Sequence, residues 1–198
     1  EIIHQIPIEY RLDGVNDVQD EPTGLSAEKL GVTLHLILAP LSQIRNLVMA
    51  LELCHVWISS KVATPYASAL AVLSQSEKDN GTTLIDIGSG IASMAIFSNG
   101  FIRYAAVLPL GGNLITKDIS YILKTPLKDA ERTKTLNGCA FLSPSDEKAS
   151  ITLPLIGEEK EGVTTNVSRK MLISIMVARI EQILDFLRMH LMSQEKED

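Results

Sequence analysis

The 198-residue sequence predicts a mixed α/β protein, and three observations point to this class. Short β-branched segments alternate with segments of helical periodicity along the chain. Hydrophobic residues make up 45 % of the sequence, which is enough for a buried core. A regular apolar stripe runs through the last predicted helix. The sequence is therefore typical of sheets covered by helices.

The first 63 residues predict a small unit of order β-β-α-β. Residues 2–10 and 32–39 have the composition of strands, and the polar residues 15–30 between them predict a loop. From Ser42 the apolar residues recur at helical spacing, so this helix is expected to cover one face of the sheet. Residues 56–58 predict a further strand.

The middle of the chain predicts a second unit of strands followed by helices. Pro65 after Thr64 is a strong start signal for a helix that ends near residue 73, and the charged residues 76–80 predict a loop. Strands are expected at 83–87, 93–97 and 101–108, with Asn99–Gly100 in the tight turn between the last two, and helices at 113–123 and from Pro126 onward.

The last third predicts one strand at residues 150–155 and a long final helix after Val167. The apolar stripe of this helix consists of Leu172, Met176, Ile180, Ile183, Leu184 and Leu187. Its polar face mixes acids with bases and lacks the Lys/Arg excess of a helix that lies on an anionic membrane. We therefore expect a helix that packs against a protein core.

Charge and cysteine content exclude several classes of function. The formal net charge of −6 opposes the attraction to phosphate backbones, so we expect no nucleic-acid partner. Cys54 and Cys139 form no CxxC pair, so we predict no disulfide framework and expect a reducing compartment. The four histidines do not have the spacing of metal ligands, so we predict no metal site. No apolar run is long enough to span a bilayer, and the strand-like start at Glu1 suggests a piece of a longer protein.

The most informative segment is the glycine-rich turn after the strand at 83–87. This strand delivers Asp86 to Gly88, Ser89 and Gly90, where the missing side chains let backbone N–H groups approach an anion such as phosphate. A carboxylate at Asp86 is suited to hold a water bound to Mg²⁺. The alternative is that the glycines only shape a tight turn, which an isolated D-x-G-x-G pattern does not exclude.

Several short sequence segments match motifs of a known protein family and occur in that family's order. They are His4 to Tyr10 with Asp13–Gly14, Pro22 to Ser26, Pro65 to Leu73, Leu84 to Gly90, Val107 to Ile119, and Thr125 through Glu131 to Ala140. In these segments the chain resembles the actin-like ATPases and, within them, the FtsA family of bacterial cell-division proteins. The resemblance implies an actin-like, ribonuclease-H-like sheet with helices.

The resemblance also implies a division of the chain into four parts. Residues 1–63 are similar to subdomain 1C, which distinguishes FtsA from actin, and residues 64–80 to the helix that returns to subdomain 1A. Residues 81–138 look like subdomain 2A with its glycine hairpin, and residues 139–198 like part of subdomain 2B. The first phosphate loop, the adenosine-binding motif and the membrane-targeting helix of the family lie outside this sequence.

For the family, the resemblance implies ATP and Mg²⁺ as cofactors, with Asp86 in the catalytic position and Gly88, Ser89, Gly90, Gly111 and Gly112 against the phosphates. This sequence departs from the family's hairpin, which usually continues Gly-Gly-Gly-Thr and then, one residue on, Asp. Here Ser89 replaces a glycine, Ile91 the threonine and Ser93 the acid. Hydroxyl and carboxylate contacts to phosphate and metal are thereby lost, so we expect a degenerate nucleotide site.

The function implied by the resemblance is a divisome protein at the inner face of the cell membrane that links FtsZ filaments to the membrane and recruits later division proteins. Candidate contacts for the acidic FtsZ tail are Arg169, Lys170 and Arg179. The 1C-like part is expected to mediate self-association and to bind later division proteins, with Arg45 and Glu52 exposed on its helix. An actin-like ATPase that acts through Asp86 and a non-functional remnant remain alternatives.

Overall fold

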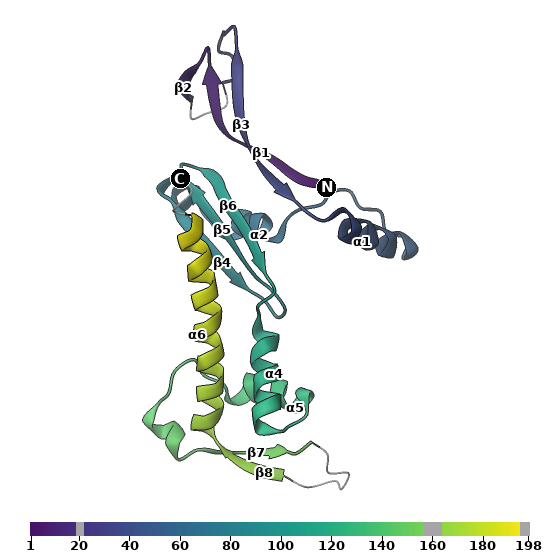
Figure 1. Cartoon of the computed structure of the whole chain (residues 1–198), viewed down its shortest axis with the longest axis vertical. Helices are drawn as coiled ribbons and strands as arrows, with labels where there is room; N and C mark the ends of the chain where they lie inside the picture. The colour runs from purple at the N-terminus through teal and green to yellow at the C-terminus, as the bar shows by residue number, and fades with distance from the viewer. Residues whose placement is uncertain (19–21, 157–163, 195–198) are drawn as a thin grey trace. The chain divides into compact units, whose positions relative to one another are not determined.

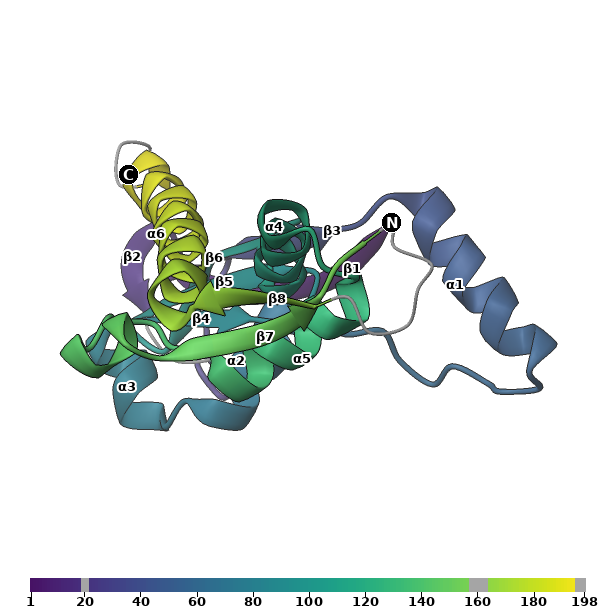
Figure 2. The ribbon, with the colours of Figure 1, turned by 90° about the horizontal axis from the view of Figure 1, so that it is seen from below.

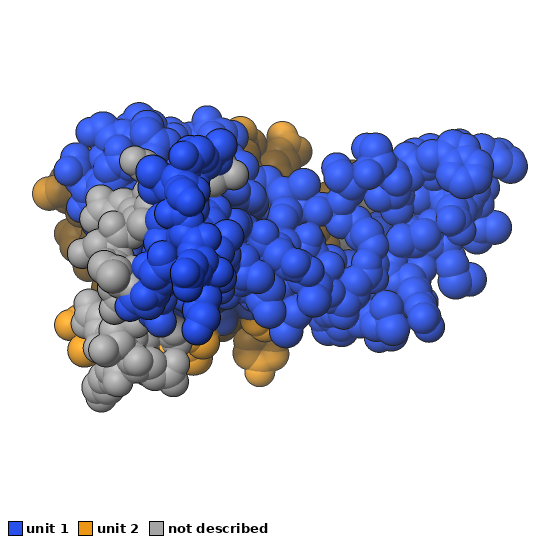
Figure 3. All heavy atoms as spheres, turned by 90° about the horizontal axis from the view of Figure 1, so that it is seen from above, with its two compact units in different colours: residues 1–86, 92–108 blue, residues 87–91, 109–198 orange. Residues whose placement is uncertain are grey.

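The computed structural model describes residues 1–18, 22–156 and 164–194 and divides into two compact units, as shown in Figures 1 and 3. Unit 1 comprises residues 1–86 and 92–108, and unit 2 comprises residues 87–91 and 109–198. Unit 1 combines helices with two small sheets and unit 2 combines helices with one, which confirms the predicted α/β class. The four-part division of the sequence stays a prediction.

Unit 1 begins with a three-stranded antiparallel sheet of order β2-β1-β3, built from β1 (Ile2–Leu12), β2 (Val15–Val18) and β3 (Leu30–Leu38). The strand β2 lies where the sequence predicted only a loop. Asp13 and Gly14 adopt positive φ angles of 52° and 82°, which form the tight turn between β1 and β2. The Asp13 carboxylate also accepts hydrogen bonds of 2.8 Å from the amides of Glu28 and Lys29.

The helix α1 (Leu41–Leu53) forms as predicted, but the strand expected at residues 56–58 is wrong. At the end of α1, His55 adopts a positive φ of 58°, and the amide of Val56 donates back to the carbonyl of Leu51 at 3.0 Å. The chain therefore leaves the helix in a turn, and Trp57 is 89 % exposed. None of the residues of α1 is buried, so the expected cover over the sheet is not seen.

A second antiparallel sheet of unit 1, of order β4-β5-β6, contains β4 (Thr82–Ile87), β5 (Ala92–Ser98) and β6 (Phe101–Leu108). The helix α2 (Thr64–Val72) begins at the predicted proline and packs on β5 and β6. The buried cluster between them consists of Ala69, Ala95, Phe97 and Ile102.

The segment predicted as a charged loop at residues 76–80 is instead a short helix, α3 (Gln75–Asn80). Ser74 and Glu77 form a reciprocal capping box, in which each side chain accepts a hydrogen bond from the other residue's backbone amide. These two bonds satisfy amides at the start of α3 that are otherwise free, so the polar sequence is stable as a helix.

Unit 2 contains α4 (Gly112–Leu123), α5 (Leu127–Asn137), the 3₁₀ turn η1 (Pro144–Glu147), β7 (Ser150–Pro154), β8 (Thr164–Ser168) and α6 (Arg169–Gln194). β7 and β8 form a two-stranded antiparallel sheet, seen in Figure 2. The hydrophobic core of unit 2 lies between α4, α5, β7 and α6. Its buried residues are Ile119, Leu123, Ala130, Leu153, Leu172 and Met176.

The long helix α6 packs beside α4 through the stripe that the sequence predicted (Figure 1). Leu172, Met176, Ile183 and Leu187 are buried, whereas Leu184 remains 48 % exposed. The prediction of a core helix is confirmed for these four residues. Within the described part of the chain, no helix combines the length and the apolar character that crossing a membrane requires.

One face of β3 remains open. Its alternate residues are apolar and between 43 % and 66 % exposed: Leu30, Val32, Leu34, Leu36 and Leu38. Because side chains of a strand alternate between its two faces, these five residues share one face. β3 is also the edge strand of its sheet. An apolar edge strand of this kind is a surface on which other protein segments pack.

Candidate functional site

The glycine hairpin of unit 2 is closed by its own backbone. The amide of Gly88 donates to the carbonyl of Ile91 at 2.9 Å, which fixes the turn that leads into β5. A Cβ atom at Gly88 would lie 3.2 Å from that same carbonyl, whereas one at Gly90 would meet nothing within 4 Å. The turn therefore constrains the first glycine more than the second.

The second glycine pair packs directly on this hairpin. The amide of Gly112 donates to the carbonyl of Gly88 at 3.0 Å, and the amide of Asn113 donates to the carbonyl of Ser89 at 2.8 Å. A Cβ atom at Gly111 would lie only 2.6 Å from the carbonyl oxygen of Ser89. Glycine at this position lets the start of α4 approach the hairpin. The structure thus brings Gly88, Ser89, Gly111 and Gly112 together.

Asp86 belongs to unit 1, where the side chain of Ser68 holds it. The Ser68 hydroxyl, on α2, donates a hydrogen bond of 3.0 Å to one carboxylate oxygen of Asp86, at the end of β4. This hydrogen bond orients the Asp86 carboxylate. The sequence analysis did not single out Ser68. That Asp86 lines one cleft with the glycines stays a prediction.

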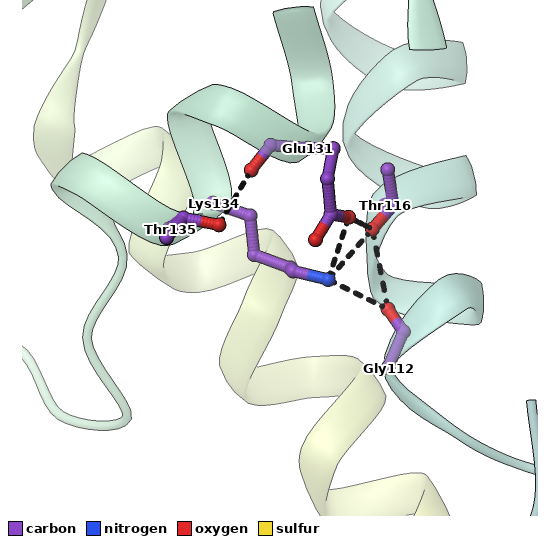
Figure 4. Close-up of polar contacts among 5 residues, drawn as sticks. All are labelled: Gly112, Thr116, Glu131, Lys134 and Thr135. Atoms are coloured by element: carbon purple, nitrogen blue, oxygen red, sulfur yellow. Dashed lines mark hydrogen bonds and ion pairs between the residues drawn. The ribbon is translucent and has the colours of Figure 1, made fainter. Parts of the chain in front are cut away.

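A network of polar side chains joins the first turns of α4 to α5 (Figure 4). The Lys134 amine, on α5, donates to the Gly112 carbonyl at 3.3 Å, to the Thr116 hydroxyl at 2.9 Å and to the Glu131 carboxylate at 2.7 Å. The Thr116 hydroxyl also contacts Glu131. This network fastens the glycine turn to α5, and the sequence analysis missed it.

The network changes the acidity of Glu131. The hydrogen bond from Lys134 lowers the pKa of the Glu131 carboxyl below its ordinary value of 4.5, and the hydroxyl of Thr116 acts in the same direction. Glu131 and Lys134 are three residues apart on one helix, a spacing that brings side chains together. That spacing is a signal from which the pair could have been predicted.

The hairpin fits a bound nucleotide only in part. Of the five predicted phosphate-binding residues, Gly88 and Gly112 have amides that already donate to protein carbonyls. Ser93, at the position of the family's acid, is 2 % exposed and carries no charge. Phosphate is bound by free amide donors and Mg²⁺ by carboxylates, and these two amides and Ser93 supply neither. That the nucleotide site as a whole is degenerate stays a prediction.

The three cations predicted to bind a partner all have acidic neighbours within unit 2. Arg179 forms a two-pronged ion pair with Asp118 of α4, in which one contact measures 2.8 Å. Arg169 lies 3.0 Å from the buried carboxylate of Asp146, and Lys170 lies 2.6 Å from Glu147. The structure therefore does not bring the three into one free cationic patch, because each fastens α6 to another element of the unit.

No metal-binding cluster is found in the described ranges 1–18, 22–156 and 164–194, where no three His, Cys, Asp or Glu residues lie close enough to share an ion. Both cysteines are free.

The comparisons with known proteins agree with the fold. The family model of the cell division protein FtsA matches residues 83–195, and the model of the SHS2 domain inserted in FtsA matches residues 1–38. MreB5 of Spiroplasma citri bound to ADP superimposes with a TM-score of 0.61 at 19 % identity, over 77 % of this chain and 48 % of that one. A PilM–PilN type IV pilus biogenesis complex gives a TM-score of 0.50 at 18 % identity, over 60 % of this chain and 35 % of that one. These likenesses confirm the actin-like fold.

Three curated relatives have higher sequence identity to this chain than these two structures. The cell division protein FtsA of Agrobacterium fabrum is 35 % identical over 94 % of this chain, and that of Neisseria meningitidis is 36 % identical over 92 %. FtsA of Escherichia coli K12 is 30 % identical over 98 %. The chain spans 42 %, 43 % and 46 % of these three relatives, less than half of each. Because the family model covers more than half of the chain, the chain belongs to the family of the cell division protein FtsA.

Proposed function

We propose that this chain belongs to a divisome protein that links FtsZ filaments to the membrane and recruits later division proteins. The observation that carries the proposal is that both family-specific models, the SHS2 insertion and FtsA itself, match one chain in consecutive order. The actin-like fold alone does not distinguish a filament protein from an enzyme, since one fold hosts many functions.

The proposed partner of unit 2 is the acidic C-terminal tail of FtsZ, with Arg169, Lys170 and Arg179 as contact residues. Their internal ion pairs mean that a tail has to compete with Asp146, Glu147 and Asp118 for these cations. Lys170 is the easiest to redirect because both it and Glu147 are about half exposed, and such pairs contribute little.

A titration of the full chain with the tail peptide of the cognate FtsZ tests this proposal. We expect binding that weakens as salt is raised, because charge pairing at an exposed surface is screened. The variant Lys170→Glu should weaken the binding roughly threefold to tenfold, as expected for an exposed ion pair. Lys148→Glu makes the same charge reversal at another exposed position of unit 2 and serves as the control. Unchanged affinity of the first variant would exclude Lys170 as a contact.

For unit 1 we propose self-association and binding of later division proteins. The supporting observation is the open apolar face of β3, formed by Leu30, Val32, Leu34, Leu36 and Leu38. Replacement of Leu34 and Leu36 by Thr preserves strand propensity and removes apolar surface. Sedimentation velocity over a range of concentrations should then show less association than the parent chain, whereas charge reversal of Arg45 or Glu52 on α1 tests the helix instead.

The nucleotide site is proposed to be degenerate. Support comes from the amides of Gly88 and Gly112, which donate to protein carbonyls, and from the uncharged Ser93 at the family's acid position. Calorimetry with ATP and Mg²⁺ should show no binding at micromolar nucleotide. A micromolar dissociation constant would contradict this proposal. It would favour the alternative of an ATPase that acts through Asp86, whose carboxylate is already oriented by Ser68.

A further inference from the structure

The C-terminal half of α4, which ends before Lys124, lines a surface depression that contains two lysines. None of the proposed contact residues Arg169, Lys170 and Arg179 lines it. Its lining residues are Lys117, Ser120, Tyr121, Lys124, Leu127 and Ile156, around a volume of about 260 Å³. All six belong to unit 2. Its lining comes from the second half of α4, the start of α5 and Ile156, which lies shortly after β7.

The backbone around this depression is held by hydrogen bonds. Lys124 adopts a left-handed conformation with φ 53° and ends α4, and its carbonyl accepts a bond of 2.8 Å from the amide of Ile156. The Ser120 hydroxyl donates to the carbonyl of Thr125 at 2.8 Å. These bonds hold the backbone at Lys124, Thr125 and Ile156 in place.

Lys117 and Lys124 are the two basic residues that line this depression. The Lys124 amine lies 4.3 Å from the centroid of the Tyr121 ring, a cation–π contact that positions the charge without neutralising it. Among the ion pairs found in the described residues, none involves Lys117 or Lys124. This differs from Arg179, whose charge Asp118 already compensates. In the described part of unit 2, Lys117 and Lys124 are thus among the basic residues without an acidic partner, and they differ from the others in lining the depression.

Apolar surface surrounds the two charges. Tyr121 is 75 % exposed, Leu127 54 % and Ile156 57 %. Leu127 is also the first residue of α5, whose amino terminus carries the positive end of a helix dipole. A phosphate or a carboxylate alone would leave this apolar rim uncovered, whereas a basic segment would meet charges of its own sign.

We propose that this surface, formed by Lys117, Tyr121, Lys124, Leu127 and Ile156, docks a short acidic peptide segment of a partner protein that carries an aromatic or aliphatic side chain. The carboxylates pair with the two lysines, and the apolar side chain covers Tyr121 between Leu127 and Ile156. This goes beyond the proposed contacts at Arg169, Lys170 and Arg179, and it holds whether or not those residues bind FtsZ.

An array of short synthetic peptides tests the proposal on the full chain. Acidic content and aromatic content vary independently in the array, and basic counterparts are included. We expect the chain to retain peptides that are both acidic and aromatic, and to release them at high salt. Equal retention of basic peptides, or retention of none, would overturn the proposal. So would binding to vesicles of anionic phospholipid in preference to the acidic peptides.

Variants then locate the site with the best peptide of the array, measured by fluorescence polarisation. The double variant Lys117→Gln/Lys124→Asn removes both charges, and asparagine tolerates the positive φ at residue 124. We expect a loss of affinity of roughly tenfold. The variant Tyr121→Ala, at a side chain that is mostly exposed, should also weaken binding while the chain stays folded.

The matched control is Lys128→Gln/Lys148→Gln, which removes two charges from exposed positions of the same unit that do not line the depression. Its affinity should equal that of the parent chain. An equal loss in control and test variants would mean that net charge alone drives binding, and would overturn the assignment of this surface. Circular dichroism of each variant verifies that its helices are intact.

Discussion

The amide of Gly112 donates a hydrogen bond to the carbonyl of Gly88, and this bond joins the two glycine-rich turns of unit 2. The turns are 24 residues apart in the sequence. Their contact depends on Gly111, where even one methyl group would collide with backbone oxygen atoms of Gly88 and Ser89 at 2.7 Å and 2.6 Å. Backbone contact therefore fixes the start of α4 against the hairpin, in addition to the side-chain bonds from Lys134 and Thr116 to the Gly112 carbonyl.

The first prediction follows from that contact. Gly111→Ala should destabilise the chain by about 1 to 3 kcal/mol, the usual cost of overpacking a tight site, because the colliding atoms are backbone and cannot rotate away. Gly90→Ala is the matched control, since a Cβ there meets nothing within 4 Å. Urea unfolding followed by circular dichroism measures both. Equal stability of the two variants would show that the turns do not pack as described.

A structural feature could be predicted from the sequence when the residues that form it are close together along the chain. The start of α2 at Pro65 and the stripe of α6 were predicted correctly, because they rest on local signals within a few residues. The contact of Asp13 with the amides of Glu28 and Lys29 joins residues 15 and 16 positions apart. No local pattern indicates such a contact. β2 itself pairs with β1 across the Asp13–Gly14 turn, a local hairpin signal, and it was missed because residues 15–30 are mostly polar.

The candidate site shows the same limit. Arg179 was predicted to contact a partner because its place on the polar face of α6 could be read from the periodicity of the helix. Its pairing with Asp118, 61 residues away, depends on how α6 packs against α4. Ser74 is different: the capping-box pattern with Glu77 is present in the sequence, but the charged residues after it favoured a loop.

The second prediction concerns that capping box. Ser74→Ala should lower the free energy of unfolding by about 0.5 to 2 kcal/mol, because it removes the hydroxyl that accepts from the Glu77 amide. Ser76→Ala, inside the same helix, loses only a 3.3 Å contact from the Asn80 side chain and should cost less. Thermal unfolding of both variants decides this. A larger effect of Ser76→Ala would mean that α3 is not held by its cap.

The third prediction concerns the ion pair between Arg179 and Asp118. The two side chains are 27 % and 25 % exposed, so their charges are only partly screened by water. A double-mutant cycle with Arg179→Gln and Asp118→Asn should give a coupling energy of about 1 to 2 kcal/mol, more than an exposed pair contributes.

The same pair affects how binding data on Arg179 are read. Arg179→Glu would place two acids together and should destabilise unit 2 on its own, since like charges at short range repel. Any loss of partner binding by Arg179→Glu therefore has to be compared with Arg179→Gln at equal folded fraction. A coupling energy near zero in the cycle would remove this concern and leave Arg179 free to bind a partner.

The last prediction is a pH dependence that arises from Glu131. Its pKa is lowered in the folded chain by the hydrogen bond from Lys134, whereas in the unfolded chain it returns to its ordinary value of 4.5. The resulting stabilisation is fully present above that value and is lost as the pH falls through the lower, folded-state pKa. Because the Glu131 side chain is 51 % exposed, solvent screens the interaction and the effect should be small.

Two variants isolate this contribution. Lys134→Met removes the main donor, so the fall in stability between about pH 6 and about pH 3 should be shallower than in the parent chain. Glu131→Gln removes the titrating group and should give the same shallower slope. Lys128 lies on the same helix and has no described ion pair, so the stability of Lys128→Met should depend on pH as that of the parent chain does. Urea midpoints measured across this range would contradict the prediction if the Lys134 and Lys128 variants lost stability in parallel with the parent chain.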